Sequence, residues 1–257
     1  EVALGLGNNT IRNTIIENVG AGSGNYWSEA GAGIFVGTLK STTGEPNWII
    51  NVTVRNTGYG IITGWEHVVN STFENVERGV FITGVRHSLY LPVEVRSNVI
   101  KNVMGTGVYG IYVSSRVNSI VENNTIVNVS DLGVVVDLTS NTRVENNTII
   151  NSSMDGILLA SGQGNIISNN RIYNSGNGIR AGASGPNTIA NNTIAGCTIG
   201  INVNGEKTSV KDNTVSESST GISVSANDNT ISNNTITGSS TGIKVSASNN
   251  IIAKNTL

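Results

Sequence analysis

Residues 121–128 read Val-Glu-Asn-Asn-Thr-Ile-Val-Asn, and versions of this stretch recur along the whole chain. Residues 144–151 repeat it closely, and residues 167–174 repeat it with Arg171 in place of the threonine. The isoleucine of each copy, or the apolar residue in its place, serves as an anchor. The anchors are Ile16, Val54, Phe73, Ile100, Ile126, Ile149, Ile172, Ile194, Val215, Ile236 and Leu257. Their spacing settles at 21–23 residues, which is the sequence signature of a solenoid.

Each repeat carries a second element, a glycine followed by alternating apolar residues. Clear copies are Gly-Val-Val-Val at 133–136, Gly-Ile-Leu-Leu at 156–159 and Gly-Ile-Ser-Val at 221–224. This alternation, bounded by Asn, Gly and Ser, predicts short strands with tight corners, and no window shows a helical stripe. A repeat of 21–23 residues with two or three short strands predicts one rung of a parallel β-helix. We therefore expect an all-β, single-stranded β-solenoid of about eleven rungs.

The asparagines of the repeat form columns. Asn124 and Ile126 share one face of a strand, so the second asparagine of the motif should point inward. A buried amide is costly alone, but stacked amides can bond from rung to rung as a ladder. The predicted inward column is Asn98, Asn124, Asn147, Asn170, Asn192, Asn213, Asn234 and Asn255. The preceding asparagine, such as Asn123, suits a left-handed corner. We also expect the asparagines two residues after the anchors, including Asn128 and Asn151, to point inward.

The Asn-Asn-Thr-Ile corner with a Gly-Ile-x-Val strand resembles the right-handed parallel β-helix repeats of the pectin-lyase-like superfamily. It is most similar to the carbohydrate-binding and sugar-hydrolase modules and to the periplasmic copper-binding β-helix proteins. The resemblance covers essentially the whole chain and implies a right-handed parallel β-helix. It implies little about activity, because such repeats serve lyases, hydrolases, epimerases, adhesins and structural surface proteins.

Composition limits the compartment and the partners. We expect residues 1–257 to form a single β-helix domain, because a solenoid grows along its axis. With a net charge of −2 and 12% charged residues, no binding to nucleic acid is expected, and no apolar run is long enough for membrane insertion. The single cysteine, Cys197, should be inert filling. Low charge and many Asn, Thr, Ser and Gly predict an extracellular or cell-surface protein. The start at Glu1 indicates a processed protein or an excised segment.

The two halves of the domain differ. Residues 1–113 contain irregular, aromatic-rich rungs with insertions, whereas residues 114–257 contain regular rungs with the asparagine ladder. The insertions are expected at residues 19–32, 37–47, 83–94 and 103–109.

The outward position of the Gly-Ile-x-Val strand is apolar in the first half. Six consecutive apolar residues occupy it, Phe35, Ile62, Phe81, Tyr112, Val135 and Leu158. Polar residues follow, Arg180, Asn202, Ser223 and Lys244. A bare apolar patch of this size is unusual on a soluble protein. We expect the inserted loops or another subunit to cover it; a sugar-stacking groove is the alternative.

Two neighbouring turns, Thr63-Gly-Trp-Glu-His67 and Thr83-Gly-Val-Arg-His87, contain the only weak candidates for catalysis. Glu66, His67, Arg86 and His87 could form an acid–base or metal pair. The simpler interpretation, which we favour, is a corner ion pair of Glu66 with Arg86, accompanied by two surface imidazoles. Two histidines fall short of a usual metal site, so we expect no metal and no cofactor. The remaining acids are scattered, and the chain is more consistent with a non-enzyme than with an enzyme.

Several corner asparagines lie in Asn-x-Ser/Thr sequons. Possible N-glycosylation sites are Asn51, Asn70, Asn123, Asn146, Asn191 and Asn233. Asn128 and Asn151 also lie in sequons, but their expected inward position should make them poor acceptors.

The two ends of the sequence are in phase. The chain finishes on the anchor Leu257, and Val2 to Leu4 supply the strand type expected next. End-to-end stacking would join Val2 and Leu4 of one copy to Thr256 and Leu257 of another. Our leading hypothesis is a non-catalytic secreted or cell-surface β-solenoid that builds an extracellular assembly from copies of itself. The alternative is a carbohydrate-active enzyme or a polysaccharide-binding module.

Overall fold

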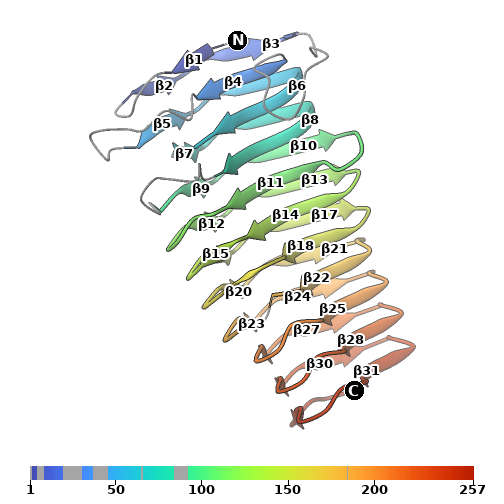
Figure 1. The fold of residues 1–257 in the computed structure, drawn as a ribbon. Coiled ribbons are helices and arrows are strands. Elements are labelled where there is room, and N and C mark those ends of the chain that lie inside the picture. The colour runs from blue at the N-terminus through green and yellow to red at the C-terminus, as the bar shows by residue number, and fades with distance from the viewer. Residues whose placement is uncertain are drawn as a thin grey trace.

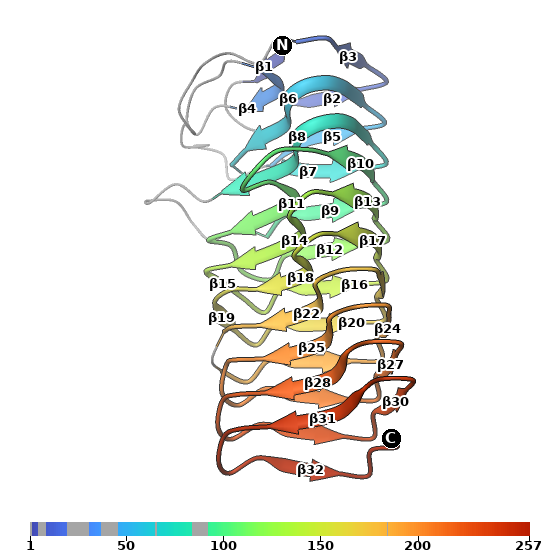
Figure 2. The same ribbon diagram turned by 90° about the vertical axis from the view of Figure 1, so that its right-hand side faces the viewer.

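The computed structural model describes residues 2–4, 9–19, 31–36, 46–64, 66–83, 92–183 and 185–257. These residues form a right-handed parallel β-helix, and no helix occurs among them. Figures 1 and 2 show the rungs stacked one upon another, with the two termini at opposite ends of the stack. Every strand pair between rungs is parallel, as the repeat predicts.

Two long sheets and one short sheet build the coil. The first has 19 strands: β1 (Val2–Leu4), β3 (Ile15–Glu17), β4 (Ala32–Val36), β6 (Thr53–Thr63), β8 (Thr72–Thr83), β10 (Val99–Val103), β11 (Tyr109–Ser114), β13 (Thr125–Val129), β14 (Leu132–Asp137), β17 (Thr148–Ser152), β18 (Asp155–Leu159), β21 (Arg171–Tyr173), β22 (Asn177–Ala181), β24 (Thr193–Ala195), β25 (Ile199–Val203), β27 (Thr214–Ser216), β28 (Thr220–Val224), β30 (Thr235–Thr237) and β31 (Thr241–Val245). The second has 11 strands: β2 (Thr10–Arg12), β5 (Asn47–Ile50), β7 (Glu66–Val69), β9 (Glu94–Arg96), β12 (Ile120–Glu122), β16 (Arg143–Glu145), β20 (Ile166–Ser168), β23 (Thr188–Ala190), β26 (Ser209–Lys211), β29 (Thr230–Ser232) and β32 (Ile251–Ala253). The short sheet pairs β15 (Thr139–Ser140) with β19 (Gly162–Gln163).

The 19-stranded sheet contains two ladders. We call the strands that carry the anchors, from β3 to β30, the anchor ladder, and those that follow each glycine, from β1 to β31, the glycine-strand ladder. Strands β6 and β8 are 11 and 12 residues long and belong to both ladders, because they continue through the corner between them. The strand register places consecutive anchors opposite one another, for example Ile100, Ile126 and Ile149, so the predicted anchor column is confirmed.

The glycine of each Gly-Ile-x-Val strand is required by a close approach inside the coil. A Cβ atom at Gly133 would lie 2.4 Å from the carbonyl oxygen of Gly156 and 2.8 Å from Cγ2 of Ile149. Contacts this short do not occur in real structures, so a side chain at this position would push the glycine-strand ladder away from the anchors. The pairing of a glycine with an anchor in each repeat therefore has a steric cause.

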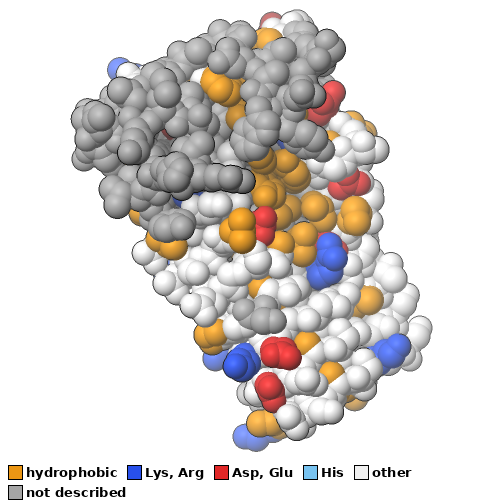
Figure 3. All heavy atoms as spheres, viewed as in Figure 1, with side chains coloured by type: hydrophobic (Ala, Val, Ile, Leu, Met, Phe, Trp, Pro, Cys, Tyr) orange, Lys and Arg blue, Asp and Glu red, His pale blue; other side chains and the backbone are white. Residues whose placement is uncertain are grey.

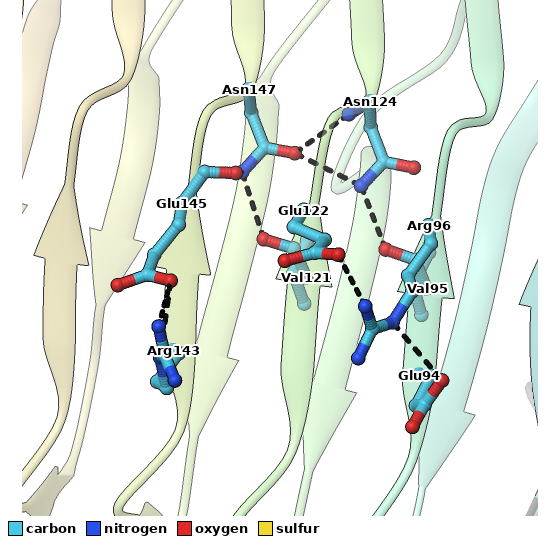
Figure 4. A network of polar contacts seen from close by, with 9 residues as sticks. All are labelled: Glu94, Val95, Arg96, Val121, Glu122, Asn124, Arg143, Glu145 and Asn147. Atoms are coloured by element: carbon cyan, nitrogen blue, oxygen red, sulfur yellow. Dashed lines mark hydrogen bonds and ion pairs between the residues drawn. The ribbon is translucent and has the colours of Figure 1, made fainter.

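The predicted inward asparagines form a continuous ladder. Asn124 donates from Nδ2 to Oδ1 of Asn147 at 2.9 Å and to the carbonyl oxygen of Val95 at 2.9 Å (Figure 4). Its Oδ1 accepts from both the backbone nitrogen and Nδ2 of Asn98, each at 3.0 Å. The same pattern extends from Asn98 to Asn255, and Asn124 is only 1% exposed. The buried amides therefore bond one another in place of water.

A second inward column begins each strand of the 11-stranded sheet, which the sequence analysis did not predict. Oδ1 of Asn165 accepts from the backbone nitrogen of Thr142 at 2.9 Å, and the backbone nitrogen of Asn165 donates to Oδ1 of Asn187 at 3.0 Å. Residues with side-chain oxygens occupy most rungs of this column, Asn9, Asn47, Glu66, Ser119, Thr142, Asn165, Asn187, Thr208, Asn229 and Asn250.

The corner asparagines behave as predicted in one column and differently in another. Asn123 and Asn146 have φ angles of 57° and 56°, in the left-handed region as expected. The prediction that Asn128 and Asn151 point inward is wrong, because both are exposed. Their φ angles are also positive, so the alternation of a strand stops before them, and Nδ2 of Asn151 donates to Oδ1 of Asn128 at 3.0 Å on the outside. The six possible glycosylation sites are likewise exposed corners, Asn51, Asn70, Asn123, Asn146, Asn191 and Asn233.

Replacing Asn147 by alanine should lower the free energy of unfolding by about 2–4 kcal/mol, because the amides of Asn124 and Asn170 lose buried partners. Asn146→Gly is the matched control: its side chain is exposed and its φ suits glycine, so it should change stability by less than about 0.5 kcal/mol. Guanidinium denaturation followed by circular dichroism measures both. Equal losses in the two variants would contradict a stabilising role for the ladder.

Candidate functional site

The outer face of the glycine-strand ladder carries the apolar residues that the sequence placed in one column. The register confirms the column, since Phe35 pairs with Ile62, Phe81 with Tyr112, and Leu158 with Arg180. Figure 3 shows hydrophobic side chains gathered near the centre of this view, beside residues that are not described. Ile62 and Val135 are buried at 6% and 3% exposure, whereas the rest of the apolar column is only partly buried. The predicted insertions 37–47 and 83–94 lie largely outside the described residues.

Three aromatic rings on this face stack on one another, and we call them the aromatic platform. The ring centroid of Phe81 lies 5.1 Å from that of Tyr112 and 5.6 Å from that of Tyr109, and the two tyrosine centroids are 4.9 Å apart. The guanidinium of Arg78, only 7% exposed, lies 4.9 Å from the ring centroid of Tyr59 and 5.3 Å from that of Tyr109. Arg78 also donates to the Tyr59 hydroxyl. These cation–π contacts add to the packing of the platform from the side of Tyr109.

A polar cluster lies farther along the same ladder towards the C-terminus. Asp155 is 1% exposed, and its Oδ2 accepts from Nε and Nη2 of Arg180 at 2.8 and 2.6 Å. Its Oδ1 accepts from Nδ2 of Asn177 at 2.7 Å, and Oδ1 of Asn177 accepts from Asn202 at 3.2 Å. These residues help to line an open pocket of about 390 Å³, which we call the polar pocket. The strand periodicity predicted Arg180 and Asn202 in the outer column. It gave no signal for Asp155 and Asn177, which lie outside that column.

Asp137 lies at the end of β14, beside the aromatic platform. Its Oδ2 accepts from the hydroxyl of Tyr112 at 3.1 Å, and its Oδ1 accepts from Oγ of Ser161 at 2.6 Å. Burial, supported by the charge of Asp137, raises the pKa of Tyr112 above its ordinary value, so Tyr112 remains a neutral donor. We call the aromatic platform, Asp137, Ser161 and the polar pocket together the strip; the platform and the pocket share the outer column along the helix axis.

The structure places Glu66 inside the coil, not on its surface. Glu66 is 3% exposed, and its Oε1 accepts from Nδ2 of Asn47 at 3.0 Å. Its electrostatic partner is Arg116, which is 1% exposed and donates to the carbonyl oxygens of Gly64 and, at 3.2 Å, Thr83. Burial lowers the pKa of Arg116 to about 10, while Glu66 opposes the shift. The predicted corner ion pair of Glu66 with Arg86 stays a prediction, because Arg86 lies outside the described residues.

His67 is also buried, at 8% exposure, which contradicts the predicted surface imidazole. It lies on the outer face of the 11-stranded sheet opposite Trp48, and the two ring centroids are 4.3 Å apart. Burial lowers the pKa of His67, so the imidazole is neutral at neutral pH. His87, the second histidine of the predicted pair, lies outside the described residues.

Charged side chains form a band on the outer face of the 11-stranded sheet. Figure 4 shows Arg96 between Glu94, at 3.0 Å, and Glu122, and it shows Arg143 paired with Glu145 at 2.6 Å. Each carboxylate is thus held by an arginine. The strand register places Glu122 opposite Glu145 on the next rung, and the band has the character of a surface salt-bridge network.

The family model described as "Periplasmic copper-binding protein (NosD)" matches residues 50–209, more than half of the chain. The chain belongs to the NosD family. No curated protein matches it. This NosD-family chain is similar in structure to endopolygalacturonase I from Stereum purpureum, solved with two galacturonates: the identity is 16%, the TM-score is 0.60, and the match covers 99% of this chain and 93% of that one. The shared fold is thereby established.

Two other solved structures are more distant. The A-module of the mannuronan C-5 epimerase AlgE6 from Azotobacter vinelandii has 13% identity and a TM-score of 0.37, over 99% of this chain and 91% of that one. PfbA, a surface adhesin of Streptococcus pneumoniae, has 15% identity and a TM-score of 0.29, over 88% of this chain and 70% of that one.

The family description raises the question of copper. Copper in proteins is bound by imidazole, thiolate and thioether groups. Among the described residues, His67 is the one histidine, Cys197 is buried at 4% exposure, and Met104 and Met154 are exposed at 60% and 50%. No group of three or more His, Cys, Asp or Glu that could hold a metal occurs in this described part. These residues therefore do not supply a copper site. Separately, the described segments contain no helix that could cross a membrane.

Replacing Arg116 by methionine should lower the free energy of unfolding by about 3–5 kcal/mol, because it leaves the buried Glu66 carboxylate without its cation. Arg143→Met removes an exposed arginine that is also paired with a glutamate, and it should cost less than about 1 kcal/mol. Denaturant unfolding compares the two. The double variant Glu66→Gln, Arg116→Met should regain part of the loss; no recovery would contradict the coupling.

Proposed function

We propose that this NosD-family chain is a non-catalytic polysaccharide-binding β-helix that acts outside the cytoplasm. The observation that carries the proposal is the aromatic platform, because the rings of Phe81, Tyr109 and Tyr112 pack together, are partly exposed, and include a ring in contact with the buried Arg78. The sequence favoured a cover of inserted loops or another subunit over the apolar column. Partial exposure of its aromatic members instead supports the alternative of a sugar-stacking surface.

Aromatic rings suit the binding of saccharides for an electrostatic reason. The face of a phenyl or phenol ring is negative, and the C–H bonds on one face of a pyranose carry a small positive charge. The platform is rigid before any ligand binds, so little conformational entropy is lost on association. Hydroxyl groups of the sugar would find acceptors and donors in Asp137, Ser161 and the polar pocket.

The direction of the strip favours a linear ligand. Neighbouring parallel strands are about 4.8 Å apart. Tyr112, Val135, Leu158 and Arg180 occupy consecutive rungs of the outer column, so the platform and the polar pocket lie on one line along the helix axis. An extended polysaccharide chain matches this geometry better than a compact small molecule does.

The carboxylates of the strip support binding more than hydrolysis. A glycosidase needs a proton-donating acid and a second carboxylate that acts as base or nucleophile. Asp137 accepts from two hydroxyls, and Asp155 accepts from Arg180 and Asn177. Glu66, a catalytic candidate in the sequence, is enclosed in the core. The described acids thus have structural partners rather than a shared reaction centre.

If the platform binds polysaccharide, Tyr112→Ala should raise the dissociation constant about tenfold, which corresponds to a loss of about 1.4 kcal/mol in binding free energy. Ser223→Ala, in the same column but in a polar rung, is the control and should leave affinity unchanged. Affinity gel electrophoresis against a panel of neutral and anionic polysaccharides measures the effect. Absence of binding to every polysaccharide, or equal affinity of wild type and Tyr112→Ala, would refute the proposal.

A second candidate function, assembly of copies end to end, is favoured by the C-terminal rung. Val245, Ile252 and Leu257 are exposed at 41%, 42% and 73%, although Ile231, one rung earlier in the column of Ile252, is fully buried. At the other end, β1 pairs with β4 in the register predicted for Val2 to Leu4. We propose that Val2 and Leu4 of one copy stack on Thr256 and Leu257 of the next.

Such stacking should make the molecular mass measured by multi-angle light scattering rise with protein concentration. The Ile252→Lys variant should suppress this rise, because it places a positive charge on the exposed apolar face of the last rung. Ile166→Lys, at a site that is 38% exposed on the side of the coil, is the matched control and should associate like the wild type. A constant monomer mass over a hundredfold range of concentration would exclude this second function.

A further inference from the structure

The charges along the strip define the chemical class of the polysaccharide. We propose, on the basis of the function proposed above, that the ligand is an uncharged glycan and not a polyuronate. A polyuronate carries a carboxylate on each sugar, so its binding requires cations that face the ligand. The described residues from Phe81 to Asn202 along this column do not present them, and Lys244 lies two rungs beyond the polar pocket.

The two arginines of the strip are already engaged. Arg180 directs both Nε and Nη2 to Oδ2 of Asp155, at 2.8 and 2.6 Å, which neutralises its charge at the edge of the polar pocket. Arg78 is 7% exposed, and its guanidinium is engaged by the rings of Tyr59 and Tyr109. Each arginine therefore organises neighbouring side chains more than it offers a free cation to a ligand.

Asp137, in contrast, places a negative charge beside the platform. Its recorded partners are the uncharged hydroxyls of Tyr112 and Ser161, and no described cation pairs with it. A carboxylate has about four acceptor positions, so about two remain for hydroxyl groups of a ligand. A neutral sugar stacked on Tyr112 would donate to Asp137. A uronate at the same position would bring a second carboxylate against it and be repelled.

The test is a binding panel with the intact chain. Neutral probes are glucan, galactan, mannan and xylan, and anionic probes are homogalacturonan and alginate. We expect the tightest binding to a neutral probe, with a dissociation constant that changes less than about twofold between 50 and 500 mM NaCl. Tightest binding to a polyuronate would overturn the inference while leaving the proposed polysaccharide function intact. Binding to none of the probes would overturn both.

A charge-swap experiment isolates Asp137. Carboxymethylation of the best neutral probe should lower its affinity for the wild type about tenfold. The Asp137→Asn variant should bind the carboxymethylated probe about fivefold more tightly than the wild type does. Asp212→Asn makes the same change in net charge at an exposed corner with φ of 58°, where asparagine fits, and it should recover nothing. Equal affinities of wild type and Asp137→Asn for the carboxymethylated probe would overturn the role of Asp137. A thermal melt confirms that both variants are folded.

Discussion

The amide ladder along the inside of the coil is the interaction on which the rest of the structure depends. Each rung from Asn98 to Asn255 presents an asparagine whose donors and acceptors are complete only when the next rung lies directly in register. A slip of one residue would leave buried amides unpaired, and the cost would recur in every rung. The ladder therefore fixes the vertical alignment, and that alignment places Phe81, Tyr112 and Arg180 in a single outer column.

The N-terminal rungs satisfy the same constraint with different chemistry. Ser71 continues the amide ladder by donating its backbone nitrogen to Asn98, while in the second inward column Glu66 takes the position that Asn47 holds one rung earlier. Arg116 is buried in the interior near the ends of β6 and β8, and it donates to the carbonyl oxygens of Gly64 and Thr83. Charge inside the coil thus replaces amides in the region that also carries the aromatic face.

The sequence predicted the periodic features well and the corner features less well. Spacing alone identified the anchors, the ladder from Asn98 to Asn255 and the outer column, because these follow from alternation within strands. The orientation of Asn128 was missed because a left-handed residue interrupts the alternation. Arg116 was missed because its side chain reaches turns that are distant in sequence. Such residues are placed by the local path of the backbone, which periodicity does not encode.

One consequence of the repeating register concerns the length of the molecule. Asn192 and Asn213 are 21 residues apart, as are Asn213 and Asn234, and each pair is joined by the same 2.9 Å hydrogen bond. Deleting or duplicating one such unit would close the ladder again with identical partners. The β-helix can therefore become longer or shorter by whole rungs without a change in the packing of its core. Evolution of such a chain toward longer or shorter surfaces needs only unequal recombination between repeats.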